Sequence, residues 1–318
     1  MGWASSCTRI HSRRRSDPSN RADRPRGERS DGGSQLTTVT RIPLASGVVH
    51  VESHGDPLGH LVLCVHGLSA NCRSFDRLVP ALAVPGNHVV TMDLRGRGHS
   101  EITASGTYGW DSHVRDLLEI AEFYGADSFD VIGHSMGGFI GMTLAAQDQQ
   151  RCRRLVLIDA LGVPEPSALV PIAKSVSRLG RTYPSAAAAL AYVRSSGTIA
   201  PWNDFWDNYF QWELETAEDS TVRIRTDLTA VSEDGADAAT HDLYALWPSI
   251  RCPVLLVRAT TPMGPEGGLV VSALDAERFA AAYTNATVVN LDADHYSVLV
   301  DPATVQSIER FMRPSTSR

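Results

Sequence analysis

The sequence predicts an α/β fold in which a mostly parallel sheet is covered by helices on both faces, and three observations indicate this. Short β-branched runs alternate with segments of helical spacing from residue 36 onward. The runs at 61–65 and 155–158 are wholly apolar, which is typical of buried central strands. Successive runs end in polar or glycine-bearing loops, and open α/β sheets bind their ligands at those carboxyl ends.

The elements can be placed in chain order from these patterns. Two strands separated by the turn at 45–47 form an antiparallel start. The later elements alternate strand and helix. The expected strands are 37–42, 48–54, 61–65, 89–92, 129–132, 155–158, 253–257 and 286–290, and the expected helices are 108–124, 139–146, 272–282 and a last one after Pro302.

An insertion interrupts this alternation at about 163–247. No strand-like run occurs there, and the segment is expected to form several helices, a cap inserted into a domain of residues 36–318. It carries an aromatic cluster. Its members are Trp202, Phe205, Trp206, Tyr209, Phe210 and Trp212. The cluster indicates an apolar, ring-containing substrate, although packing of the cap against the body explains it equally well.

Composition excludes several classes of protein. Residues 1–35 hold eight Arg against four acidic residues and have no apolar run, so we expect a disordered tail and not a secretory signal. The remainder is acidic, which argues against nucleic-acid binding. No apolar run approaches the roughly 20 residues that span a bilayer, so no membrane partner is expected. Lys174 is the only lysine, and this preference for Arg indicates a GC-rich bacterial genome.

The five cysteines are odd in number, scattered, and without the spacing of zinc ligands. Neither a disulfide framework nor a metal site is therefore expected, and a reducing, cytoplasmic location fits best. No organic cofactor is expected either. The sequence leaves open whether the chain forms a homo-oligomer.

The strongest chemical signal is Gly133-His134-Ser135-Met136-Gly137, because it stands between an expected strand and a small-residue helix. A serine on such a sharp turn exposes its hydroxyl, and the flanking glycines permit the close approach that a side chain would block. Ser135 is therefore the candidate nucleophile. The alternative is a glycine-rich turn with an incidental serine.

With these motifs the sequence resembles the α/β-hydrolase family, from residue 36 to the C-terminus apart from the cap. The resemblance implies an eight-stranded sheet and a triad in the order Ser, acid, His. His66-Gly67-Leu68 resembles the family's oxyanion loop, so the backbone N–H groups of Leu68 and Met136 are the expected oxyanion donors. His66 itself is expected to brace that loop. The charged turn at 93–100 resembles the family's DxRGxGxS turn and is expected to be structural.

The resemblance places the general base at His295, in Asp294-His295-Tyr296 between the last strand and the last helix. His241 has no strand before it and is expected to be a surface or packing residue. The acid departs from the commonest family pattern, since Pro262 stands near the position where many relatives carry aspartate. Asp159, after the preceding strand, is the favoured substitute, because some members such as haloalkane dehalogenases place their acid there.

Three alternatives to Asp159 as the acid remain. Glu266 comes next, from the loop after the post-cap strand, whereas Asp292 and Asp294 are very close along the chain to His295. Asp159 can also simply cap or brace the loop that enters the cap. The acid is therefore the least determined member of the triad.

The expected activity is hydrolysis of a small, apolar carboxylic ester or lactone through an acyl-enzyme. A serine nucleophile argues against epoxide hydrolases and haloalkane dehalogenases, whose nucleophile is an aspartate. Hydrolysis of a C–C bond in a β-diketone-like substrate and cofactor-free haloperoxidase-like or perhydrolytic activity use the same triad. A catalytically silent ligand-binding protein is the alternative outside enzymes, because a fold does not determine a function.

Overall fold

A mixed eight-stranded sheet forms the centre of the molecule. The computed structural model describes residues 37–264 and 267–313. Along the sheet the order is β1-β2-β4-β3-β5-β6-β10-β11. The strand bounds are β1 Thr38–Leu44, β2 Gly47–Gly55, β3 His60–Val65, β4 Asn87–Met92, β5 Phe129–His134, β6 Cys152–Ile158, β10 Val254–Ala259 and β11 Ala286–Leu291. Only β2 runs antiparallel to its neighbours β1 and β4, so the expected antiparallel start and eight-stranded sheet are both confirmed.

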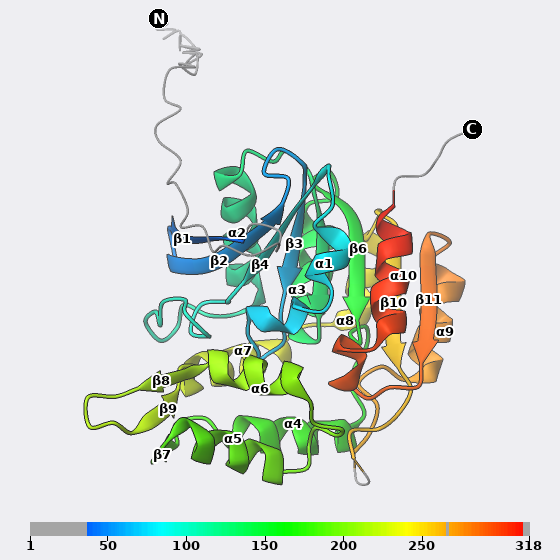
Figure 1. The fold of residues 1–318 in the computed structure, drawn as a ribbon. Helices are drawn as coiled ribbons and strands as arrows, with labels where there is room; N and C mark the ends of the chain where they lie inside the picture. Colours follow the sequence, from blue (N-terminus) through cyan, green and yellow to red (C-terminus); the bar gives the residue numbers. More distant parts are fainter. Residues whose placement is uncertain (1–36, 265–266, 314–318) are drawn as a thin grey trace, which may run out of the picture.

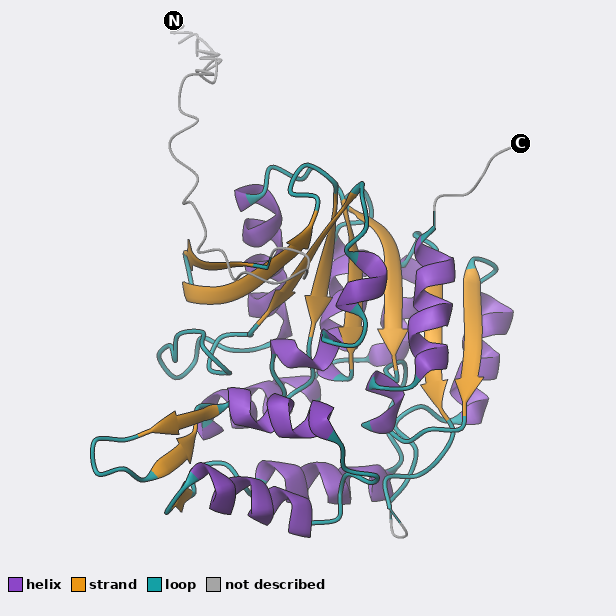
Figure 2. Cartoon of the chain, in the orientation of Figure 1, coloured by secondary structure: helices purple, strands orange, loops and turns teal. Residues whose placement is uncertain are grey.

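Helices cover both faces of this sheet (Figures 1 and 2). On one face α2 (Trp110–Phe123), α3 (Met136–Gln147) and α9 (Ala273–Ala282) share an apolar core with β3 and β6. On the other face α1 (Val79–Leu82) and α10 (Pro302–Met312) pack together. The central strands are apolar on both faces because neither face meets water.

The expected elements of the body match those observed within a few residues. Helix α1 was not expected, because its four residues are too few to carry a helical period. The 3-10 turns η1 (Cys72–Phe75) and η4 (Ser297–Leu299) are equally short. The expected disordered tail at 1–35 lies outside the described residues.

The inserted cap lies beneath the carboxyl ends of the strands (Figure 1). Its helices are α4 (Leu169–Val176), α5 (Ala186–Ser195), α6 (Asp204–Trp212), α7 (Leu228–Ala238) and α8 (Leu243–Leu246), with 3-10 turns η2 (Pro166–Ala168) and η3 (Trp247–Ser249) at its two ends. The expectation of a cap without strands is wrong. Three short strands, β7 (Thr182–Tyr183), β9 (Val222–Ile224) and β8 (Leu214–Thr216), form a small antiparallel sheet in that order. Runs of two or three residues are too short to show an alternating pattern.

The aromatic residues of α6 hold the cap against the body. Phe205, Trp206, Tyr209 and Phe210 are all buried and belong to the same apolar cluster as β3, β5 and α10. Burying side chains of this size contributes roughly 1.5–3 kcal/mol each. Their packing explains the aromatic cluster of the cap without a substrate. No helix in the described part of the chain is long and apolar enough to cross a bilayer.

Candidate active site

Ser135 stands on a sharp turn between β5 and α3. Its backbone has φ 53° and ψ −124°, a conformation that is uncommon for a residue with a side chain. The turn is held by the Ser135 N–H, which donates to the carbonyl of Ile158 at 3.1 Å. A Cβ at Gly137 would lie 2.0 Å from the Val65 carbonyl oxygen, so only glycine fits there. Ser135 is half-buried and directly precedes the first turn of α3.

Asp159 and His295 meet at the carboxyl edge of the sheet. Asp159 directly follows β6 in a left-handed conformation, with φ 48°. Its Oδ2 lies 2.7 Å from Nδ1 of His295, and its Oδ1 accepts a hydrogen bond from the Ala259 N–H at 3.1 Å. A carboxylate at Nδ1 favours the tautomer that leaves Nε2 unprotonated, which is the arrangement a general base requires.

His134 connects the nucleophile turn to the loop of His295. Its Nε2 donates to the His295 carbonyl oxygen at 3.0 Å, and the two imidazole centroids are 4.6 Å apart. Burial and the nearby His295 lower the pKa of His134 well below its usual range, so this ring stays neutral. His134 therefore positions the neighbouring segments and is not a base.

The loop after β3 passes against Ser135. A Cβ at Gly67 would lie 3.1 Å from the Cβ of Ser135. The Leu68 carbonyl accepts a hydrogen bond from Nε of Arg97 at 3.0 Å, and the Gly67 carbonyl, which shares a peptide with the Leu68 N–H, accepts one from the Ala70 N–H at 3.2 Å. Within residues 37–264 and 267–313, the N–H groups of Leu68 and Met136 have no hydrogen-bond acceptor. Two backbone donors are thus available beside Ser135.

His66 braces this loop, as expected. The Leu94 N–H donates to Nε2 of His66 at 3.0 Å, so the ring carries its proton on Nδ1 and donates it to the Gly67 carbonyl at 2.8 Å. Burial lowers the pKa of His66 to about 4, against a smaller opposing effect of Asp93. A ring with both nitrogens engaged has no lone pair to offer a substrate.

The charged turn at 93–100 has the structural role expected of it. Asp93 accepts hydrogen bonds from the N–H groups of Cys72 and His99 and from the indole of Trp212. The donor atoms of His50 and Cys72 lie within 4.8 Å of each other and of Asp93, a grouping with metal-ligand chemistry. Both carboxylate oxygens of Asp93 already accept hydrogen bonds from protein groups in this arrangement.

The other candidates for acid and base have separate partners. Asp292 accepts a hydrogen bond from Thr261, Asp294 accepts from the N–H groups of the loop that follows it, and Glu266 lies outside the described residues. His241 pairs with Asp237 at 3.0 Å and stacks on Trp110, which agrees with a packing role.

Two buried Arg–carboxylate pairs that involve the cap were missed in the sequence. Arg97 lies 2.6 Å from Asp234 in α7 of the cap, and Arg178, after α4, lies 2.9 Å from Glu213 at the end of α6. All four side chains are at most 4% exposed. The charges are visible in the sequence, but nothing in it indicates which of many charges become partners.

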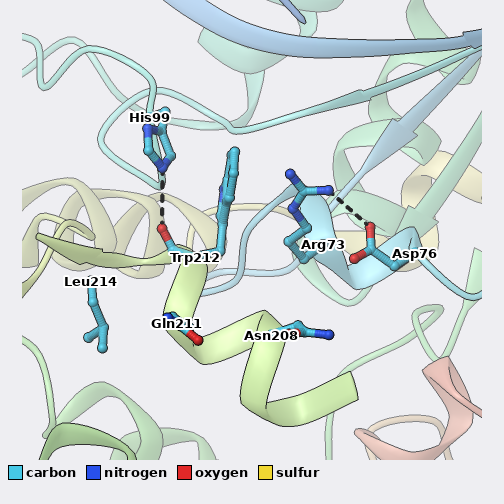
Figure 3. Close-up of a pocket in the computed structure, with 7 residues that line it drawn as sticks. All are labelled: Arg73, Asp76, His99, Asn208, Gln211, Trp212 and Leu214. Atoms are coloured by element: carbon cyan, nitrogen blue, oxygen red, sulfur yellow. Dashed lines mark hydrogen bonds and ion pairs between the residues drawn. The ribbon is translucent and has the colours of Figure 1, made fainter. Parts of the chain in front are cut away.

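A hollow of about 490 Å³ opens at the edge of the cap, around Trp212 (Figure 3). The guanidinium of Arg73 lies 4.0 Å from the centroid of the Trp212 ring, and His99 packs on the ring with centroids 4.2 Å apart. None of the residues that line this hollow is Ser135, His295 or Asp159. Its aromatic and charged groups attach the end of α6 to the body.

The strand order and the serine turn together define the class of protein. The profile of the alpha/beta hydrolase fold family matches residues 60–302, and the chain belongs to that family. A 3-hydroxybutyrate-oligomer hydrolase of Cupriavidus necator is 29% identical over 275 residues, which cover 81% of this chain and 90% of the relative.

Two further likenesses cover different parts of the chain. A 2-hydroxymuconate semialdehyde hydrolase of a Pseudomonas species is 29% identical over 130 residues, 40% of this chain and 46% of the relative. A crystal structure of E-2-(acetamidomethylene)succinate hydrolase superimposes with a TM-score of 0.76 at 23% identity, over 87% of this chain and 99% of that chain. The last likeness shows the fold alone.

Proposed function

We propose that this chain hydrolyses a carboxylic ester or lactone, with Ser135 as nucleophile, His295 as general base and Asp159 as the acid of the triad. The observation that carries the proposal is the 2.7 Å contact between Asp159 and His295 beside the strained turn of Ser135. Strained non-glycine backbone persists where the surroundings hold it, and such positions cluster at active sites.

In the proposed reaction, Nε2 of His295 takes the proton of Ser135 as its Oγ attacks the carbonyl carbon. The oxygen of the tetrahedral intermediate accepts hydrogen bonds from the N–H groups of Leu68 and Met136. His295 then protonates the leaving alkoxide, and an acyl-enzyme remains. A water molecule, deprotonated by the same imidazole, releases the acid and restores Ser135.

The ester class is supported by the likeness to the 3-hydroxybutyrate-oligomer hydrolase, since oligomers of 3-hydroxybutyrate are joined by ester bonds. C–C bond hydrolysis on the same residues is the second candidate. It is favoured by the likeness to 2-hydroxymuconate semialdehyde hydrolase, whose named substrate is not an ester. The aromatic residues of α6 are buried against the body, so they no longer support an apolar, ring-containing substrate.

The test compares wild type with Ser135→Ala on chromogenic esters, lactones and a β-diketone-like substrate. We expect ester or lactone turnover in wild type and a loss of at least about 10⁴-fold in the variant. A fluorophosphonate probe should label wild type at Ser135 and leave the variant unlabelled. Turnover confined to the diketone would replace the ester proposal by the second candidate. Absence of labelling would indicate a binding protein without an activated serine.

A further inference from the structure

A second, smaller hollow lies beside the catalytic loops and has a lining unlike that of a purely apolar ester site. Its volume is about 240 Å³, and it is bounded by α4, α5, the segment between α5 and α6, and Tyr296. Drug-sized ligand pockets are commonly about 300–1,000 Å³. A space of this size suits one short arm of a substrate.

Two cations line the hollow, and no carboxylate lines it with them. Lys174 and Arg178 are one helical turn apart, and no Asp or Glu is among the lining residues. Lys174 Nζ donates to the Ser196 carbonyl at 2.6 Å, and it has no ion pair within the described ranges. Lys174 is also the only lysine in the chain.

Arg178 lines the hollow with a side chain that is only 4% exposed. One Nη donates to the carbonyl of Ser175, and the other donates to Glu213 and to the carbonyl of Ser69. Its Nε is buried and has no hydrogen-bond acceptor among the residues described. Because this Nε is closed off from solvent, the guanidinium acts on the hollow through its positive charge.

The hollow borders both halves of the candidate catalytic machinery. Tyr296 in its wall directly follows His295. Arg178 donates to Ser69 at 3.1 Å, the residue after the oxyanion donor Leu68. The hollow therefore lies next to the two segments that carry His295 and Leu68.

We propose that this hollow binds a carboxylate of the substrate, through Lys174 and Arg178, so that the enzyme prefers esters with a free carboxylate on the acyl chain. The inference rests on the proposed ester hydrolysis and names its substrate class. Charged hydrogen bonds to a carboxylate are the strongest polar contacts available to such a site. Glu213 offsets one of the two positive charges, and Lys174 leaves the wall with a net positive charge.

The experiment compares monoethyl succinate with diethyl succinate, which differ by one free carboxylate. We expect wild type to have the higher kcat/KM on the monoester. Lys174→Met should lower the ratio of the two kcat/KM values about tenfold, the usual effect of one charged hydrogen bond. The ratio cancels any difference in the folded fraction. Arg223→Met is the matched control, because it removes a cap cation whose side chain is 64% exposed and paired with Glu215.

A second measurement does not depend on turnover. Free succinate should slow the labelling of Ser135 by a fluorophosphonate probe, and neutral succinamide should not; Lys174→Met should reduce the protection by succinate. Equal ratios in wild type and Lys174→Met, or equal protection by succinate and succinamide, would overturn the carboxylate site while leaving ester hydrolysis intact. Failure of the ester proposal itself would show as no turnover of either succinate ester by wild type.

Discussion

Two buried aspartates of this molecule have nearly the same partners. Asp159 at the end of β6 bonds a histidine, His295, at 2.7 Å and a backbone N–H at 3.1 Å. Asp234 in the cap helix α7 bonds a histidine, His113, at 3.0 Å and the Gly109 N–H at 2.7 Å. Both carboxylates are at most 1% exposed.

The difference lies in what else surrounds each pair. Asp234 also has the guanidinium of Arg97 at 2.6 Å, and His113 is fully buried. Burial alone would raise the pKa of Asp234, but the bonds to His113 and Arg97 outweigh it and lower that pKa to about 2. Asp159 has no cation in an ion pair apart from His295 in the described structure. The two pairs therefore differ in a third charge, and under the proposed function one Asp-His pair takes part in catalysis whereas the other attaches the cap to the body.

Among the variants that test the difference between the two aspartates, we expect Asp159→Asn to have the largest effect. Asp159→Asn removes the negative charge that stabilises the imidazolium and favours the wrong tautomer of His295, so kcat should fall about 10⁴-fold. Steady-state kinetics on the ester that wild type hydrolyses fastest would measure the fall in kcat. Asp292→Asn is the control, since that carboxylate is bonded to Thr261. Equal losses in both variants would remove Asp159 from the triad.

We expect Asp234→Asn to lower the stability of the fold strongly and to change kcat less than Asp159→Asn does. Removing one charge of a buried pair leaves Arg97 uncompensated, which is expected to lower the free energy of unfolding by about 3–5 kcal/mol. Urea denaturation would measure the loss. Glu215→Gln, at an exposed pair with Arg223, should cost less than about 1 kcal/mol. A kcat loss in Asp234→Asn as large as that of Asp159→Asn, without loss of stability, would contradict the contrast.

A second buried cap carboxyl, Glu213, makes the stability of the protein depend on pH. Burial raises the pKa of Glu213 to about 7, and Arg178 offsets only part of this effect. The folded state therefore binds a proton that the unfolded state has released, and this contribution to stability is lost as pH rises from about 4.5 to about 7. It amounts to at most about 3 kcal/mol.

The measurement is the free energy of unfolding of wild type and Glu213→Gln between pH 5 and pH 8. We expect wild type to lose stability relative to the variant as pH rises. Glu215→Gln should run parallel to wild type over the same interval. A wild-type curve parallel to that of Glu213→Gln would show that the carboxyl titrates at its ordinary pKa.

Features formed by contiguous residues could be predicted from the sequence, whereas contacts between distant segments could not. The turn of Ser135 was predictable because strand, glycines and helix are contiguous. Asp159 was favoured as the partner of His295 because some members of the family place their acid after the same strand, although other carboxylates stayed open. The short strands β7, β8 and β9 could not be predicted, since two or three residues are too few to show an alternating hydrophobic pattern. The pairing of Arg97 with Asp234 depends on how the cap folds over the body, and no local pattern encodes it.

The cap leaves the sheet after β6 and returns as β10, and these two strands are hydrogen-bonded neighbours, with Leu155 opposite Val254. The two ends of the insertion are also close together, since the indole of Trp247 donates to the carbonyl of Leu161 at 3.3 Å, and the sheet is continuous across the insertion. The sequence of the cap can therefore change while the strands of the body are kept. A library that varies α4 and α5 while keeping Arg97 and Asp234 could redirect substrate choice without altering the chemistry below.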